Sequence, residues 1–375
     1  MLAEIIILLI IFFSVFVGHI YLVYLISLIS FFWVFMYMVS TGVLKWNKPI
    51  LFSFLFFAWV VVVNFYYGIY DISILGKYSI IFTLIFLMLH FGSLSLVNKI
   101  QKIILLSSCF AASVIIFNFL TGNTYLGGDR YSIGDYINAN YVAYTLVMSV
   151  AILYIYRFIF SEKFTKSDLF CVFIIFVGIS LTGSRGAIIS FLAISTFYVI
   201  KKYFSNILHG FFLSIGILIA SFLVFLFIPK DIFDRLLFKN SPTTMDYTSG
   251  RSDQWPEAVR LINNNPWIGN GADAFTRLNH IYVSDETTLQ LHNVFLVIVV
   301  EFGFIGLSLY ILTLFFIMKR FFNLGLYKGG FIMLIFIGYW LPIALTGIWA
   351  YTIPAWVFFS WLMVLGCVYK ENGHS

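Results

Sequence analysis

An arginine separates two apolar runs in the sequence SLTGSRGAIISF of residues 180–191. Arg185 is flanked by glycines and small hydroxyl residues, which permit close approach of another backbone or of a ligand. A lone arginine at a helix end often only extends its head group from the bilayer toward water. Here the small neighbours give the arginine stem little to lie against. Arg185 is therefore a candidate ligand for an anion, with snorkelling at the interface as the alternative.

Three further arginines, Arg251, Arg260 and Arg277, lie in one long polar segment, residues 229–289. Guanidinium groups bind phosphate oxygens with planar, bidentate geometry and stay charged at any relevant pH. Arginines that converge from this segment could therefore clamp a pyrophosphate group. The alternative is a solvated loop face, which is the commoner role for a residue such as Arg277 and carries equal weight for Arg260.

His292 and Asn293 open the apolar segment that follows, LQLHNVFLVIVVEFGFIGL. A neutral imidazole near its ordinary pKa can take the proton of a sugar hydroxyl as that hydroxyl attacks, which is general-base catalysis. A lone histidine is more often a satisfied polar residue, and we assign that ordinary role to His280. The position of His292 at the outer start of a helix makes it the candidate base, with Asn293 as a neighbouring substrate ligand.

Glu301 lies nine residues beyond His292. On an ideal helix this spacing is about half a turn of net rotation and about 13 Å of depth. A carboxylate inside a membrane needs a partner. We therefore expect Glu301 to be a structural or coupling residue rather than the direct partner of His292. Gly303 and Gly306 predict close packing of this helix against another.

Another polar connection, TGNTYLGGDRYSIGDYINANYVAY, brings Arg130 and Asn140 to the same side as Arg185. Together with Asp129 they could line a sugar site, or they could satisfy the backbone of a glycine-rich loop; the sequence favours neither role. The three cysteines are far apart in the sequence and lack ligand spacing. The cysteines therefore indicate neither a metal site nor a disulfide, and no cofactor is expected.

The elements that carry these residues are membrane helices. Of the 375 residues, 62% are hydrophobic and 10% are charged, which is outside the range of soluble domains. We predict an all-α integral membrane protein, a single polytopic domain over residues 1–375 with about 12 transmembrane helices. The predicted spans are residues 3–17, 20–40, 49–67, 78–96, 103–120, 139–158, 168–183, 186–200, 208–228, 290–317, 329–347 and 351–369.

Basic residues set the expected orientation. If the N-terminus is cytoplasmic, every inner connection carries Lys or Arg, as the positive-inside rule requires. The short outer connections then hold only Lys77, Arg130 and Arg185. The segment 229–289 then lies on the outer side as one long loop, and loops of this length are often functional. Within it, DQWPEAVRLINNN predicts a short amphipathic helix that ends before Pro266.

Three motifs in this order resemble the O-antigen ligase and polymerase family of bacterial inner membranes. They are TGSRGA at the start of a span, GRSDQW followed by NPWIGNGADAF in the outer loop, and HN followed after nine residues by GFIG. The resemblance covers roughly residues 125–310. It implies a GT-C-like glycosyltransferase that takes a glycan from undecaprenyl pyrophosphate on the periplasmic face and joins it to an acceptor hydroxyl without a metal. It also implies that Arg185 and Arg251 grip the pyrophosphate and that His292 activates or orients the acceptor.

Within this family, a polymerase joins lipid-linked repeat units and a ligase transfers the glycan to lipid A-core. The polymerase is slightly favoured, because no feature of the sequence can be tied to a lipid A-core acceptor. Expected partners are the lipid-linked donor, the glycan or lipid A-core acceptor and the lipid bilayer; a chain-length regulator stays open, and no nucleic acid is expected. A flippase or other transporter is the alternative of another class. Polar groups concentrated on one face, with Glu301 as the main deep charge, favour the enzyme.

Overall fold

The computed structural model describes most of the chain. The described residues are 47–125, 130–134, 137–202, 254–278, 291–322, 324–346 and 353–371, with isolated positions before residue 47 and at residues 211 and 215.

The regular secondary structure of these residues is helical throughout, which confirms the all-α class. Six helices in the described part are long and apolar enough to cross a membrane, and the chain is therefore a multi-pass membrane protein. The predicted spans 3–17, 20–40 and 208–228 lie outside the described residues, apart from isolated positions. The count of 12 spans stays a prediction.

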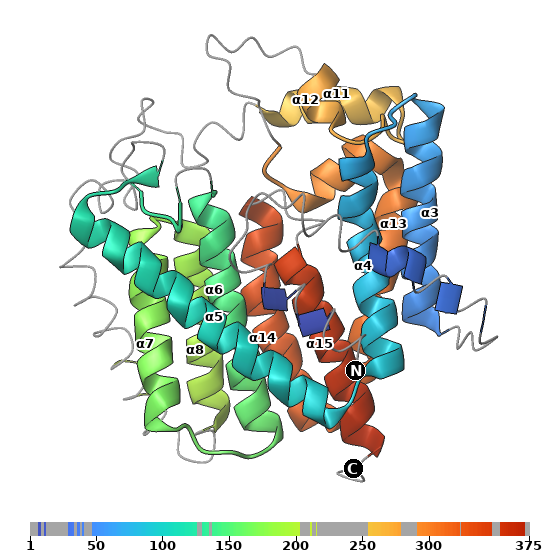
Figure 1. Ribbon diagram of the computed structural model, residues 1–375. Coiled ribbons are helices and arrows are strands. Elements are labelled where there is room, and N and C mark those ends of the chain that lie inside the picture. The colour runs from blue at the N-terminus through green and yellow to red at the C-terminus, as the bar shows by residue number, and fades with distance from the viewer. Residues whose placement is uncertain are drawn as a thin grey trace.

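The helices keep the labels of Figure 1. They are α3 (Lys48–Tyr66), α4 (Ile72–Phe91), α5 (Leu94–Thr121), α6 (Ala139–Ile159), α7 (Lys166–Leu181), α8 (Arg185–Lys202), α11 (Trp255–Asn264), α12 (Ala274–Leu278), α13 (Val294–Phe322), α14 (Gly325–Thr346) and α15 (Ile353–Glu371).

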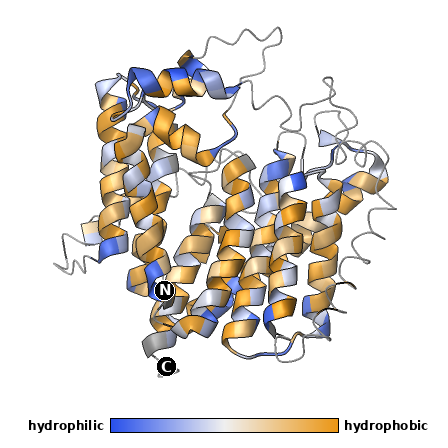
Figure 2. Cartoon of the chain, turned by 180° about the vertical axis from the view of Figure 1, so that it is seen from behind, coloured by the Kyte–Doolittle hydropathy of each residue, from blue (hydrophilic) through white to orange (hydrophobic). Residues whose placement is uncertain are grey.

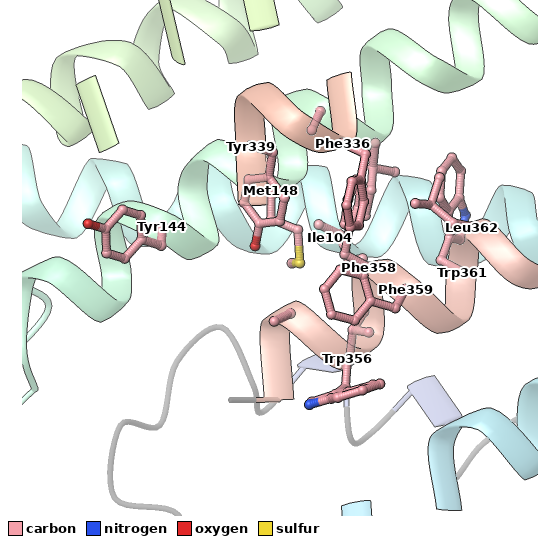
Figure 3. Packing of buried hydrophobic residues seen from close by; sticks show 14 of the residues in the cluster. Ile104, Tyr144, Met148, Phe336, Tyr339, Trp356, Phe358, Phe359, Trp361 and Leu362 are labelled. Atoms are coloured by element: carbon pink, nitrogen blue, oxygen red, sulfur yellow. The ribbon is translucent and has the colours of Figure 1, made fainter. Parts of the chain in front are cut away.

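Two groups of helices build the bundle. In one group α5, α6, α7 and α8 pack together, with α14 against α6 and α8; in the other, α3 packs against α4 and α13. Helices α14 and α15 join the groups, because α14 also contacts α13 and α15 contacts α4, α5 and α6. Their buried aromatic side chains fill the centre, where Tyr339 of α14 lies edge-on to Phe358 of α15 with ring centroids 4.7 Å apart (Figure 3).

The two ends of the bundle differ in charge. Helices α11 and α12 lie across one end, above α3, α4 and α13 (Figure 1), and we call this end the loop side. Hydrophilic residues gather at the helix ends and on α11, with hydrophobic residues between them (Figure 2). Basic residues lie at the other end, including Lys48 in the first turn of α3, Arg157 in the last turn of α6 and Lys319 in the last turn of α13. This distribution is the one the positive-inside rule predicts for a loop side that faces outward.

The boundary between α4 and α5 lies earlier than predicted. The sequence placed this connection at residues 97–102, whereas α5 already begins at Leu94. Ser93 caps α5, since its Oγ accepts a hydrogen bond from the Leu96 N–H at 3.1 Å. Apolar residues lie on both sides of this cap, so hydropathy alone does not place it. Lys99 and Lys102, which the sequence placed in this connection, lie on α5 instead. Lys77, which was expected in an outer connection, lies within α4.

Helix α13 is broken at Gly303, which has φ 66° and ψ −173°. Only glycine adopts this combination readily. It divides α13 into residues 294–302 and 304–322, whereas the unbroken apolar run predicts one continuous span over residues 290–317. The prediction that Gly303 serves helix packing is also wrong, because a Cβ there would lie 2.2 Å from the carbonyl oxygen of Trp267 in the loop.

Candidate functional site

The turn between α7 and α8, residues 182–184, leads directly into Arg185. The Thr182 hydroxyl donates to the Ile179 carbonyl oxygen at 2.6 Å, which closes the end of α7. Ser184 is buried, and among the described residues its Oγ has no hydrogen-bond partner. Arg185 is half-buried, with its Nη1 shielded from solvent. The start of α8 therefore brings a hydroxyl, a guanidinium and the first backbone N–H groups of a helix to one place, a combination suited to an anion.

Arg130 braces this turn from the connection between α5 and α6. Its Nε donates to the Thr182 carbonyl oxygen at 2.8 Å, and its Nη2 donates to Oδ1 of Asn140 on α6 at 2.7 Å. The structure thus brings Arg130 and Asn140 together with the turn before Arg185. Both guanidinium contacts are internal, as in the second role considered for this loop, and substrate binding by the pair stays a prediction. Asp129 lies outside the described residues.

His292 and Asn293 lie immediately before α13. His292 is half-buried. The Oδ1 of Asn293 accepts hydrogen bonds from the N–H groups of Phe295 at 3.0 Å and Leu296 at 3.1 Å, which makes Asn293 the N-cap of α13. This cap fixes the backbone next to His292. Binding of a substrate by Asn293 stays a prediction.

Helix α14 links the starts of α8 and α13. On one side, Ser190 in the second turn of α8 donates to the Tyr339 carbonyl oxygen of α14 at 3.5 Å. On the other side, the ring of Phe295 in the first turn of α13 lies edge-on to Trp340 of α14, with centroids 5.5 Å apart. Tyr339 and Trp340 are adjacent, so both helix starts reach the same part of α14. Arg185 and His292 therefore flank one helix on the loop side.

Residues 265–273, which we call the docked turn, connect α11 to α12 and fit into the break of α13. The N–H groups of Asn270 and Gly271 donate to the carbonyl oxygens of Val300 at 3.0 Å and Glu301 at 2.9 Å. These carbonyl groups lie in the last turn before the break, where the helix itself cannot supply their partners. The docked turn therefore replaces the missing hydrogen bonds on this side of the break.

The other side of the break is satisfied in the same way. The N–H groups of Phe304 and Ile305 donate to the carbonyl oxygens of Pro266 at 2.8 Å and Trp267 at 3.4 Å. A Cβ at Gly269 would lie 2.4 Å from the backbone of α13, so this approach requires glycine. The motif NPWIGNG in the loop and the motif GFIG in α13 are thus two halves of one contact, which explains their joint appearance in the sequence.

Polar side chains of α3 and its C-cap reinforce the docked turn. The hydrogen bonds run from Trp59 Nε1 to the Phe302 carbonyl oxygen (2.9 Å), from the Ala272 N–H to Asn64 Oδ1 (2.8 Å) and from the Tyr67 hydroxyl to the Gly269 carbonyl oxygen (2.8 Å). Gly306 faces the ring of Trp59, consistent with the close packing expected there.

Glu301 ties the docked turn to a second helix. Its side chain is buried; Oε1 accepts from the Asp273 N–H at 3.0 Å, and Oε2 accepts from the Tyr78 hydroxyl of α4 at 2.8 Å. A negative charge near the C-terminal end of the short helix 294–302 is unfavourable, because that end of a helix carries a partial negative charge. Burial of a carboxylate adds a further cost. These contacts fit the structural role expected for Glu301.

The three arginines of the long loop differ in placement. Arg260 forms a bidentate pair with Glu257 on α11, at 2.8 and 2.7 Å, and also donates to the Leu278 carbonyl oxygen at 2.9 Å. The hydrogen bonds to Glu257 raise the pKa of Arg260. Arg277 donates to carbonyl oxygens of the docked turn at 3.2 and 2.9 Å. Arg251 lies outside the described residues. Phosphate binding by all three stays a prediction.

Sequence reasoning missed the residues that hold the docked turn. Asn64 is a single polar residue in the apolar run VVVNFYY, and Asn270 lies between two glycines. The Nδ2 of Asn270 donates to the carbonyl oxygens of Leu261 and Val300, both at 3.0 Å. A buried amide inside an apolar segment needs partners, and that requirement was the available signal for Asn64.

Residues 170–311 match the protein family described as O-antigen ligase. The matched segment contains most of α7, all of α8, α11 and α12, and the first part of α13, and therefore both Arg185 and His292. The match supports the resemblance of this segment to the O-antigen ligase and polymerase family, whose members are glycosyltransferase-like enzymes. No curated protein sequence matches the chain.

Proposed function

We propose that the protein is a glycan polymerase that joins lipid-linked oligosaccharide repeat units on the periplasmic face of the bacterial inner membrane. The donor would be a glycan on undecaprenyl pyrophosphate, and the acceptor a hydroxyl of the next lipid-linked unit. The loop side would face the periplasm, in a bundle of about 12 spans. The observation that carries this proposal is the start of α8, where Ser184 and Arg185 lie beside a helix N-terminus, across α14 from His292.

The proposed reaction is a displacement at the anomeric carbon. The acceptor oxygen forms a bond to this carbon, the bond from the carbon to the phosphate oxygen breaks, and the lipid pyrophosphate leaves. The hydroxyl proton passes to the neutral ring of His292. Arg185, joined by Arg251, would stabilise the negative charge that grows on the leaving group, a task for which fixed cationic donors are effective. Attack from the face opposite the leaving group inverts the configuration.

The experiment uses purified protein in detergent with chelator present and an undecaprenyl-pyrophosphate-linked repeat unit. A ladder of lengthening glycans on a gel is the expected product. Arg185→Ala and His292→Ala should each remove the ladder, and Lys102→Ala, on the exposed face of α5 at the basic side, should retain it. A ladder that persists in Arg185→Ala would contradict the role of this arginine.

Two other functions predict different products. A ligase of the same family would form no ladder but would cap added lipid A-core with the glycan. A flippase would transfer nothing in detergent and would move the donor across a vesicle membrane. In that case His292→Ala would leave the donor on the inner face in cells, whereas an enzyme would leave it exposed and unused on the outer face.

A further inference from the structure

Helix α11 has a wide apolar face, and the rest of the protein buries only part of this face. At 100° per residue, Ala258 and Leu261 point toward α13 and are buried, and Trp255 and Val259 occupy the adjoining arc. Trp255 is 48% exposed and Val259 is 50% exposed. Polar residues such as Asn264 occupy the opposite arc. The helix therefore meets three surroundings: the bundle, water, and something apolar that lies beside the bundle.

The docked turn, which directly follows α11, carries further exposed apolar residues beside α13. Trp267 is 67% exposed and Ile268 is 41% exposed. The Trp267 ring lies edge-on to Phe304, with centroids 6.1 Å apart. Phe304 heads a row of exposed residues on α13 that continues through Ile311 and Phe315 at helical spacing. In a membrane protein such an apolar row faces lipid, so the exposed side chains of the docked turn adjoin the lipid-facing surface.

The length of α13 places this surface at the membrane boundary. From Phe304 to Phe322 the helix would span about 28 Å, close to the hydrocarbon thickness of about 30 Å. Phe304 therefore lies at the edge of the hydrocarbon on the loop side. Trp267 is level with it, since its carbonyl oxygen accepts from Ile305. Tyr66 and Tyr70, at the loop-side end of α3, are also exposed, as in an interfacial aromatic belt.

We infer that α11 and residues 266–268 are an interfacial anchor that lies in the leaflet on the loop side. Trp255, Val259, Trp267 and Ile268 insert at the boundary between head groups and acyl chains of the phospholipids. The polar arc of α11 faces water. This geometry is typical of amphipathic helices bound in the plane of a membrane. The inference does not depend on the reaction proposed above; an additional consequence would be a loop held close to a lipid-linked substrate.

The test places a bimane fluorophore on α11 in full-length protein reconstituted in phosphatidylcholine nanodiscs. Val259→Cys carries the label on the apolar arc, and Asn264→Cys, about 140° around the helix, is the matched control. Wild-type protein labelled in parallel supplies the background from the three native cysteines. Quenching is then measured with phosphatidylcholine that bears a nitroxide at carbon 5 of the acyl chain.

A blue-shifted emission and at least twofold stronger nitroxide quenching at position 259 than at position 264 are expected. Equal emission and equal quenching at the two positions would overturn the anchor. The anchor would also be overturned if the label at position 259 is water-exposed in nanodiscs and its emission shifts to the blue only when glycan or another protein is added. Trp255→Asp provides a second measurement, since it should reduce the quenching at position 259 while the protein remains folded, as judged by its elution as a single species.

Discussion

The α7–α8 turn and the docked turn both lie on the loop side, but their polar groups are used differently. In the docked turn, Asn270 and the backbone groups on both sides of Gly303 are bonded within the protein. In the α7–α8 turn, Arg130 braces the backbone through Thr182, and the buried Oγ of Ser184 has no partner among the described residues. A buried hydroxyl without a partner is costly. We therefore propose that the docked turn holds a helix and that the α7–α8 turn receives a ligand.

The two turns also position different residues of the loop side. The docked turn fixes the short helix 294–302 and therefore the direction from which His292 enters the loop side. The α7–α8 turn places Arg185 at the first residue of an 18-residue helix. Substitutions in the docked turn should therefore mainly alter geometry and stability, whereas substitutions in the α7–α8 turn should mainly alter donor binding or catalysis.

Replacement of Arg185 should have the largest effect on catalysis. We expect Arg185→Ala to reduce the rate of glycan transfer about 100-fold to 1,000-fold, the range for removal of one donor that stabilises transition-state charge. Arg185→Lys should recover only part of this loss, because an ammonium group cannot form the bidentate pair. The measurement is the initial rate with a lipid-pyrophosphate-linked donor. An unchanged melting temperature for both variants would separate this effect from misfolding, and full activity of Arg185→Ala would remove the distinction between the two turns.

Replacement of Gly303 should have the largest structural effect. Alanine at φ 66° and ψ −173° costs about 1–3 kcal/mol, and its Cβ would meet the Trp267 carbonyl oxygen at 2.2 Å. We expect Gly303→Ala to lower the melting temperature in detergent and to reduce activity at least tenfold, because His292 moves with the helix.

Gly330→Ala is the matched control for this effect. Gly330 lies in α14 with nothing within 4 Å of an added Cβ, so alanine there should be neutral or should stabilise by about 0.5–1 kcal/mol. A wild-type melting temperature for Gly303→Ala would show that the docked turn does not hold the helix.

The membrane class and the polar residues on the loop side were predictable, whereas the break in α13 was not. Hydropathy identifies long apolar runs regardless of their internal hydrogen bonding, so residues 290–317 were predicted as one continuous span. The partner of the break lies about 35 residues earlier in the sequence, in the docked turn. Glycines at both places were visible, but only their spatial contact shows that Gly303 accepts a loop rather than a helix.

The start of α8 was the more predictable part of the site. The motif TGSRGA combines small residues with a single charge, and these properties are local. The brace from Arg130 was less predictable, because it connects residues 52 positions apart. For Arg260 the sequence predicted a phosphate ligand or a solvated side chain; its pairing with Glu257, one helical turn away, was not predicted.

Substitutions of Glu301 distinguish whether its hydrogen bonds or its charge hold the docked turn in place. Glu301→Ala removes the partners of the Tyr78 hydroxyl and the Asp273 N–H, and each buried group left unsatisfied costs about 1–3 kcal/mol. We expect a lower melting temperature and about tenfold lower activity. Glu301→Gln can keep both hydrogen bonds, because the tyrosine hydroxyl can accept as well as donate, and it should restore most of both quantities. Loss of activity in Glu301→Gln with normal stability would instead point to a role for the charge itself.

Ser184 should give the smallest effect, and its sign separates a binding group from a structural one. If the hydroxyl is reserved for the donor, Ser184→Ala removes one hydrogen bond worth about 0.5–1.5 kcal/mol and weakens donor binding about twofold to tenfold. The same change removes a buried hydroxyl that has no partner in the described part of the protein, so the melting temperature without donor should rise. The melting temperature and KM are therefore both expected to rise, measured by thermal unfolding without donor and by initial rates against donor concentration. A lower melting temperature with an unchanged KM would mean that Ser184 supports the start of α8, and the two turns would then share one structural purpose.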